Sequence, residues 1–92
     1  MVKVEIYTGM LCGFCEQAKR LLDKKSIKYI EIDTSFDPSQ RDIMTKRANG
    51  KFTVPQIFIQ DQYIGGCDEL YELERNNNLD KLLKINEKWI QN

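Results

Sequence analysis

The chain has 92 residues, of which 41% are hydrophobic and 30% charged, and fourteen Lys and Arg residues balance fourteen Asp and Glu residues. This length predicts one small domain over residues 1–92. The zero net charge argues against binding to nucleic acid or to an anionic membrane, because both require a surplus of Lys and Arg. The absence of histidine excludes His-dependent catalytic triads and zinc sites of the Cys/His type.

The amino-terminal segment Met1–Ile6 alternates apolar and charged residues, unlike the apolar stretch of a secretory signal. No segment is long enough to span a bilayer. The three cysteines are an odd number, and two of them are too close in sequence to staple a secreted fold. We therefore expect a protein of the cytoplasm, or alternatively of an organelle stroma, without a membrane segment.

The first elements form a strand, a helix and a second strand. Alternation over Val2–Tyr7 predicts a half-buried strand. Apolar residues with helical spacing predict an amphipathic helix from Gly13 to Lys25. Ile27–Ile32 is apolar and β-branched, which predicts the second strand, and residues 33–35 favour a turn after it.

The next segment combines a short helix with a hairpin. Asp37 before Pro38 is typical of a helix start, and the helix is expected to stop at Asn49-Gly50. Phe52–Ile59 and Tyr63-Ile64 are rich in aromatic and β-branched residues and flank a polar pair, which predicts a β-hairpin.

Two helices complete the chain. Asp68-Glu69 supplies acidic residues to a helix start, and three consecutive asparagines end that helix. Apolar residues from Leu79 to Trp89 then predict a final amphipathic helix, in which Trp89 is expected to anchor in the core. The whole order predicts one α/β sheet with helices covering its faces.

Two cysteines lie at the start of the predicted first helix, in the order Cys12-Gly13-Phe14-Cys15. Positions i and i+3 of a helix share a face, so this pair can switch between dithiol and disulfide. The helix start stabilises a thiolate on Cys12, and Cys15, one turn inside, would act as the resolving thiol. Half of a zinc site and a static disulfide are the alternatives. Redox use is favoured, because one Cys pair leaves a metal short of ligands.

Four segments match one known family. The chain contains, in order, Ile6-Tyr7-Thr8, Cys12-Gly13-Phe14-Cys15, Thr53-Val54-Pro55 and Ile64-Gly65-Gly66-Cys67-Asp68-Glu69-Leu70. With this pattern the sequence resembles the glutaredoxins of the thioredoxin-like superfamily, over roughly residues 2–84. The resemblance implies a thioredoxin-like fold, in which a four-stranded mixed sheet (β-α-β-α-β-β-α plus a C-terminal helix) has helices on both faces.

The resemblance also implies a glutathione-dependent thiol–disulfide oxidoreductase in which Cys12 and Cys15 are catalytic. Its partners would be glutathione, disulfide-bonded or glutathionylated proteins and, through glutathione, glutathione reductase. We expect a monomer without a metal.

A glutathione site follows from the same resemblance, residue by residue. A cis Pro55 would bring its loop beside Cys12, and Val54 backbone groups would pair with the cysteinyl part of glutathione. Backbone N–H groups of Cys67 and Asp68, after Gly66, would bind the γ-glutamyl carboxylate. The side chains of Thr53 and Asp68 would add polar contacts, the latter to the amino group. A plain strand-edge proline, a simple Gly65-Gly66 turn and an ordinary helix cap at Asp68 are the alternatives.

The sequence departs from the family at two places. Gly9 stands where glutaredoxins usually carry a lysine that binds the glycyl carboxylate of glutathione and favours the thiolate. We assign that carboxylate to Arg47, with Lys51 as the other candidate; both are also consistent with solvated surface charges. Gly13-Phe14 replaces the usual Pro-Tyr between the cysteines.

The Gly13-Phe14 pair also occurs in monothiol glutaredoxins, whose motif ends in serine where this chain has Cys15. Those proteins form a glutathione-ligated dimer around a 2Fe-2S cluster, which makes cluster binding the second hypothesis, because a Cys12 thiolate is a suitable soft ligand. A redoxin recycled by thioredoxin reductase is the third. The Gly65–Asp68 pattern of a glutathione site argues against it.

Overall fold

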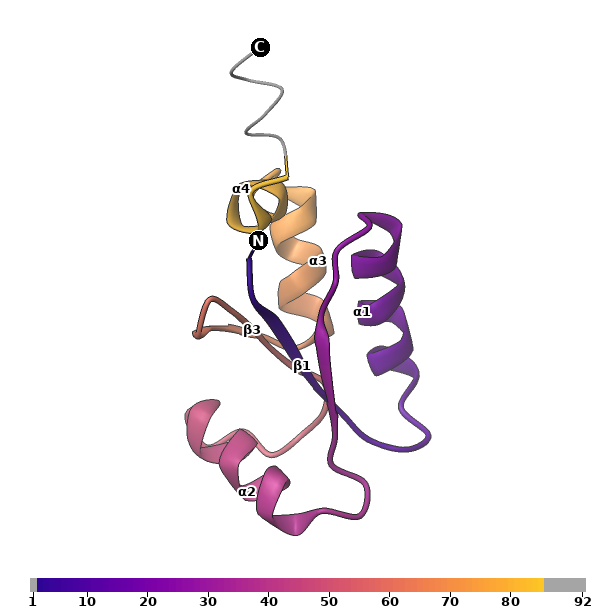
Figure 1. The fold of residues 1–92 in the computed structure, drawn as a ribbon, viewed down its shortest axis with the longest axis vertical. Helices are drawn as coiled ribbons and strands as arrows, with labels where there is room; N and C mark the ends of the chain where they lie inside the picture. The colour runs from indigo at the N-terminus through magenta and orange to yellow at the C-terminus, as the bar shows by residue number, and fades with distance from the viewer. Residues whose placement is uncertain (1, 86–92) are drawn as a thin grey trace.

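The computed structural model describes residues 2–85 and shows a twisted sheet with helices on both faces (Figure 1). The elements in chain order are β1 (Val4–Thr8), α1 (Gly13–Lys24), β2 (Ile30–Asp33), α2 (Pro38–Arg47), β3 (Gln56–Ile59), β4 (Gln62–Gly65), α3 (Cys67–Arg75) and α4 (Leu79–Leu83). The predicted element order is therefore confirmed. No helix within residues 2–85 has the length and apolar character needed to cross a membrane.

The sheet is mixed, with strand order β2-β1-β3-β4. β1 runs parallel to β2 and antiparallel to β3, and β3 forms a hairpin with β4. The parallel pair is joined by α1, as parallel neighbours require a crossover connection. This is the predicted thioredoxin-like sheet, and it brings the carboxyl end of β1 beside the amino end of β3.

Successive side chains of the central strands β1 and β3 point to opposite faces of the sheet, which divides the core into two layers. Side chains of one parity, such as Ile6 and Ile57, pack under α1, α3 and α4, whereas Tyr7 and Phe58 face α2 and its buried Met44. The two central strands are therefore buried on both faces, and both layers fix the position of the loop that leaves β1.

The start of α2 is built as predicted. Pro38 occupies the first turn, and the Asp37 carboxylate caps the helix by accepting a hydrogen bond from the backbone N–H of Gln40 at 3.2 Å. A bond to Ser39 and the Gln40 N–H lower the pKa of Asp37. The cap therefore stabilises the fold above the ordinary Asp pKa and is lost as the pH falls through the lowered value.

Several boundaries differ from the prediction. β1 begins at Val4 instead of Val2, and β3 begins at Gln56 instead of Phe52, directly after the cis proline. β2 begins at Ile30, because the N–H of Ile27 donates to the carbonyl of Leu22 and ties the preceding residues to the end of α1. α4 ends at Leu83, because Lys84 adopts a left-handed conformation with φ 57°. The predicted anchor Trp89 lies outside the described residues.

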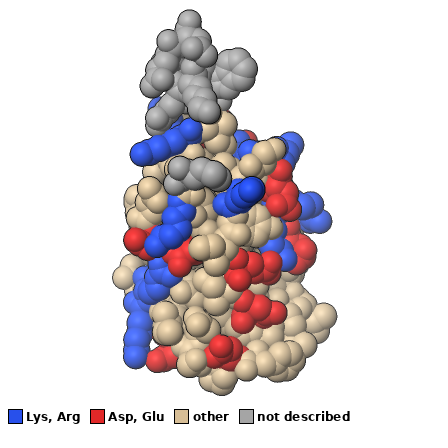
Figure 2. All heavy atoms as spheres, in the orientation of Figure 1, with Lys and Arg blue, Asp and Glu red and all other residues tan. Residues whose placement is uncertain are grey.

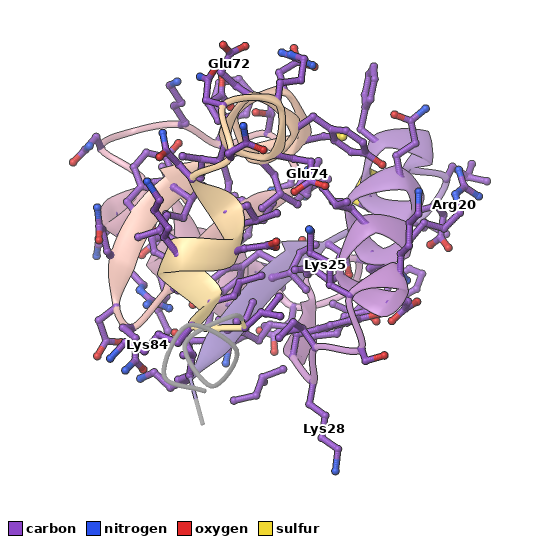
Figure 3. All side chains as sticks on the ribbon, turned by 90° about the horizontal axis from the view of Figure 1, so that it is seen from above. Arg20, Lys25, Lys28, Glu72, Glu74 and Lys84 are labelled. Atoms are coloured by element: carbon purple, nitrogen blue, oxygen red, sulfur yellow. A yellow bond between two sulfur atoms is a disulfide. The ribbon has the colours of Figure 1, made fainter. Side chains whose placement is uncertain are left out.

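Lys25 ties the carboxyl end of α1 to the last two helices. Its Nζ lies 2.8 Å from a Glu74 carboxylate oxygen and 2.6 Å from Asp80 Oδ1. Viewed from above, Lys25 and Glu74 point toward one another between α1 and α3 (Figure 3). Only 14% of the lysine side chain is exposed, so this pair is shielded from much of the solvent.

Candidate active site

The cysteine pair begins α1, as predicted. Cys12 is the N-cap residue, and its Sγ accepts a hydrogen bond from the backbone N–H of Cys15 at 3.0 Å. The two residues form a disulfide with a Cα–Cα distance of 5.2 Å. Cys15 is only 1% exposed, whereas Cys12 is half-buried. In the reduced protein the same N–H would favour a thiolate on Cys12, and Cys12 is the sulfur that a substrate can reach.

A proline loop faces the cysteines from the start of β3. The Val54–Pro55 peptide bond is cis, which confirms the expectation drawn from the resemblance. The Val54 carbonyl oxygen lies 3.7 Å from Cys12 Sγ, so residues 42 positions apart meet at the reactive sulfur. Pro55 precedes β3 and is not a strand-edge residue.

A chain of three polar side chains supports this loop. Tyr63 donates to Gln56 Oε1 at 2.7 Å, and Gln56 Nε2 donates to the Thr53 carbonyl at 3.0 Å and to Thr53 Oγ1 at 3.3 Å. Gln56 is 2% exposed, so its amide is a buried polar group with its partners in place. Sequence analysis did not assign Gln56 or Tyr63. The available signal was a glutamine inside an apolar strand, directly after the proline.

Two glycines allow α3 to begin against the proline loop. Gly65 has φ +124°, and a Cβ there would lie 2.7 Å from Glu69 Cγ. A Cβ on Gly66 would lie 3.2 Å from the Pro55 carbonyl oxygen. The Gly66 N–H donates to Glu69 Oε1 at 2.7 Å, which caps the helix from within. The Gly-Gly pair therefore does more than turn the chain.

A cleft of about 340 Å³ lies between these elements and has the size of a small-ligand site. Six of the seven residues predicted to bind glutathione line it: Thr53, Val54, Pro55, Gly66, Cys67 and Asp68. Cys67 and Asp68 belong to the first turn of α3, whose N–H groups have no acceptor within the helix. Phe14, from the turn between the cysteines, forms part of the wall.

Arg47, the seventh predicted residue, is not brought to the cleft. Its guanidinium donates to Glu5 at 3.0 Å and to the Tyr7 hydroxyl at 2.9 Å, and it lies 4.0 Å from the centre of the Phe58 ring. Lys51, the other candidate, lines the cleft. The structure therefore points to Lys51 in place of Arg47 as the cation beside this site.

The third cysteine is a poor nucleophile. Cys67 is 6% exposed, and burial, reinforced by the nearby carboxylates of Asp68 and Glu69, raises the pKa of its thiol. Its Sγ lies 3.8 Å from Gln17 Oε1. Cys67 is therefore better suited to packing and to backbone contacts than to chemistry.

The chemistry of the site follows from its donor set. Within residues 2–85 no group of three or more His, Cys, Asp or Glu side chains is placed to hold a metal ion. A half-buried sulfur at a helix start, paired with a buried second sulfur, supports thiolate attack and disulfide exchange. On a mixed four-stranded sheet with an opposing cis-proline, this defines a thioredoxin-like thiol–disulfide oxidoreductase.

Comparison with known proteins identifies the family. The glutaredoxin family model matches residues 4–64, so the chain belongs to the glutaredoxin family. A probable glutaredoxin of Synechocystis is 53% identical over 81 residues, which cover 88% of this chain and 74% of that protein.

Solved structures agree. A Brucella melitensis glutaredoxin has a TM-score of 0.80 and 48% identity, covering 92% of this chain and 91% of its own. A buckwheat glutaredoxin solved as a complex with glutathione has a TM-score of 0.81 and 27% identity, covering 88% and 76%.

Proposed function

We propose that this glutaredoxin uses glutathione to reduce glutathionylated proteins and protein disulfides, in the cytoplasm. The observation that carries the proposal is the convergence of six predicted glutathione-binding residues on one cleft at the edge of the Cys12–Cys15 pair. The similar buckwheat protein was solved as a complex with glutathione, which supports the same ligand here.

The reaction is two thiol–disulfide exchanges. The Cys12 thiolate attacks the glutathione sulfur of a protein–glutathione disulfide, forms a Cys12–glutathione disulfide and releases the protein thiolate. A second glutathione thiolate then attacks the glutathione sulfur of that disulfide, which returns the Cys12 thiolate and gives oxidised glutathione. With a protein disulfide as substrate, the Cys12 thiolate attacks one sulfur and forms a mixed disulfide with the protein, and Cys15 then attacks Cys12 Sγ and releases the reduced protein. Two glutathione molecules reduce the resulting Cys12–Cys15 disulfide and leave as oxidised glutathione.

The cleft supplies contacts for each part of glutathione. The Val54 backbone, beside Cys12 Sγ, would pair with the cysteinyl unit. The first turn of α3 would bind the γ-glutamyl carboxylate through the N–H groups of Cys67 and Asp68, and the Asp68 carboxylate would bind the amino group. Lys51, which also lines the cleft, would pair with the glycyl carboxylate.

Glutathione-coupled reduction of a small glutathionyl disulfide, followed through glutathione reductase and NADPH, tests the proposal. The wild type should turn over, Cys12→Ser should be inactive, and Cys15→Ser should keep this activity while losing reduction of protein disulfides. Equal loss of both activities in Cys15→Ser would contradict the division of roles. If the folded, reduced wild type shows no turnover, the glutathione-ligated 2Fe-2S dimer becomes the better hypothesis, with brown colour after anaerobic reconstitution as its check.

A further inference from the structure

The loop between β1 and α1 exposes large apolar side chains beside the reactive sulfur. Met10 is 60% exposed, Leu11 is fully exposed and Phe14 is 60% exposed. Leu11 also has φ +53°, a left-handed conformation that is uncommon for a leucine. Folding alone does not explain this arrangement, because Leu11 buries none of its side chain and sits in a disfavoured backbone region.

These side chains border a second hollow. It has a volume of about 540 Å³, and Met10, Leu11, Gly13 and Gln17 line it together with the groups around Cys12. The hollow and the glutathione cleft share Phe14 and Val54 as walls. Cys12 itself lines this second hollow, and the glutathione cleft adjoins it across the shared residues Phe14 and Val54.

The two depressions differ in polarity. The cleft is lined by Lys51, Asp68 and Glu69 among others, whereas no charged residue lines the second hollow. In Figure 2 the protruding lower right, where Figure 1 places the β1–α1 loop, shows neither Lys or Arg nor Asp or Glu at its surface. Exposed apolar surface gathered at one place on a small protein is typical of an interaction site.

We propose that this hollow binds apolar residues that flank the modified cysteine of a glutathionylated protein. The inference rests on the proposed function and specifies its substrate class. A protein–glutathione disulfide must bring both its glutathione and its own chain to Cys12 Sγ at the same time. Since glutathione takes the polar cleft, the protein chain lies over the second hollow, where Met10, Leu11 and Phe14 present apolar surface. Leucine or phenylalanine residues next to the modified cysteine would be buried there. Charged residues at the same positions would lose their hydration without gaining an ion pair or hydrogen bond.

Short glutathionylated peptides test this selectivity directly. Two peptides differ only in having leucine or serine on both sides of the modified cysteine, and glutathionyl-cysteine serves as the substrate without flanking residues. Release of the peptide thiol is measured with Cys15→Ser protein, so that only attack by Cys12 on the glutathione sulfur is followed. Each rate is divided by the rate of the same peptide with dithiothreitol, which removes differences in intrinsic reactivity.

The leucine peptide should react roughly tenfold faster than the serine peptide, the effect of half-burying about one leucine side chain. Met10→Gln combined with Leu11→Gln should bring this ratio close to one. Ile30→Gln is the matched control and should keep the ratio, because Ile30 is also an exposed apolar residue (53%) but lies away from the active-site loop. It pairs with Glu5 in the sheet, whereas Thr8, the residue of β1 nearest that loop, pairs with Asp33.

The outcomes separate the two hypotheses. Turnover of glutathionyl-cysteine together with equal normalised rates for both peptides would overturn the apolar docking site and leave the proposed function intact. A preference for leucine that survives in the double variant would also overturn it. Failure to react with all three substrates would refute the proposed function, and this inference with it.

Discussion

Replacing Gly65 by alanine tests how α3 is held against the cis-proline loop. The new Cβ would lie 2.7 Å from Glu69 Cγ and 2.8 Å from Glu69 Oε1, and the residue would keep φ +124°. To relieve the contact, the glutamate must move, which breaks the hydrogen bond that it accepts from the Gly66 N–H at 2.7 Å.

The expected decrease in the free energy of unfolding has two parts. A non-glycine residue at this φ costs about 1–3 kcal/mol, and loss of the capping hydrogen bond costs about 1 kcal/mol more. Gly50→Ala is the matched control, because Gly50 has φ +94° but a Cβ there meets nothing within 4 Å. Gly50→Ala therefore includes the cost of placing a non-glycine residue at positive φ but not the cost of a steric clash. Gly13→Ala, in the first turn of α1 with open space around it, should be neutral or stabilising by up to about 1 kcal/mol.

Urea unfolding of the three variants measures these differences. Gly65→Ala should lower the free energy of unfolding by about 1 kcal/mol more than Gly50→Ala, which corresponds to a further fall in melting temperature of about 4–8 °C. It should also raise the KM for glutathione, because the start of α3 forms one wall of the cleft. Equal destabilisation by the two variants would refute the steric argument.

Three further predictions test the site and its support. Because the pKa of Cys67 is raised, its alkylation by iodoacetamide should be slower in the folded than in the unfolded protein and should increase only at higher pH; equal rates would contradict its burial. Lys51→Gln should raise the KM for glutathione roughly two- to fivefold, whereas Lys46→Gln, exposed on α2 and paired with Asp42, should not; equal effects would argue against Lys51 in the cleft. Burial lowers the pKa of Lys25, but its two carboxylate partners outweigh this and raise it above 10.5. Lys25→Met should therefore cost about 1–2 kcal/mol of stability at neutral pH, and the difference from wild type should vanish as the pH rises through that raised pKa. A pH-independent difference would show that packing, not charge, is lost.

Local patterns carried most of the correct predictions. The Cys12–Cys15 spacing, the Asp37-Pro38 helix start and the alternation of β1 all depend on residues a few positions apart, so one chain suffices to recognise them. The cis Pro55 and the six cleft residues were obtained through the family resemblance, because their convergence depends on contacts between distant segments. The Cys12–Val54 contact is an example.

Arg47 shows where sequence alone was insufficient. Met44 is the only buried residue of α2, so the apolar pattern did not define which face the helix turns to the sheet. That face depends on the pairing of β1 with β3, which places Glu5 opposite Phe58 and creates the site that Arg47 occupies. The end of α4 at Lys84 likewise depends on a left-handed residue that helical spacing does not reveal.

Gly9→Lys tests what the missing family lysine contributes here. A Cβ on Gly9 would lie 3.2 Å from Val54 Cγ2 and 4.0 Å from Thr34 Oγ1, so a side chain fits if the valine methyl yields slightly. The added ammonium would lie in the loop that leads to Cys12. It should favour the thiolate of Cys12 over the thiol and strengthen glutathione binding, through attraction to the thiolate and to the glycyl carboxylate.

Gly9→Gln separates charge from shape, because it makes the same contact with Val54 without the charge. The rate of Cys12 alkylation is measured against pH in Cys15→Ser protein, at low and high salt. The lysine variant should shift the profile to lower pH, and high salt should weaken the shift, because the pair is close to solvent. If the glutamine variant shifts the profile equally, the cause is movement of Val54 against the sulfur and not the added charge. The start of α1 would then stabilise the thiolate by itself, without the contribution that a lysine makes in other glutaredoxins.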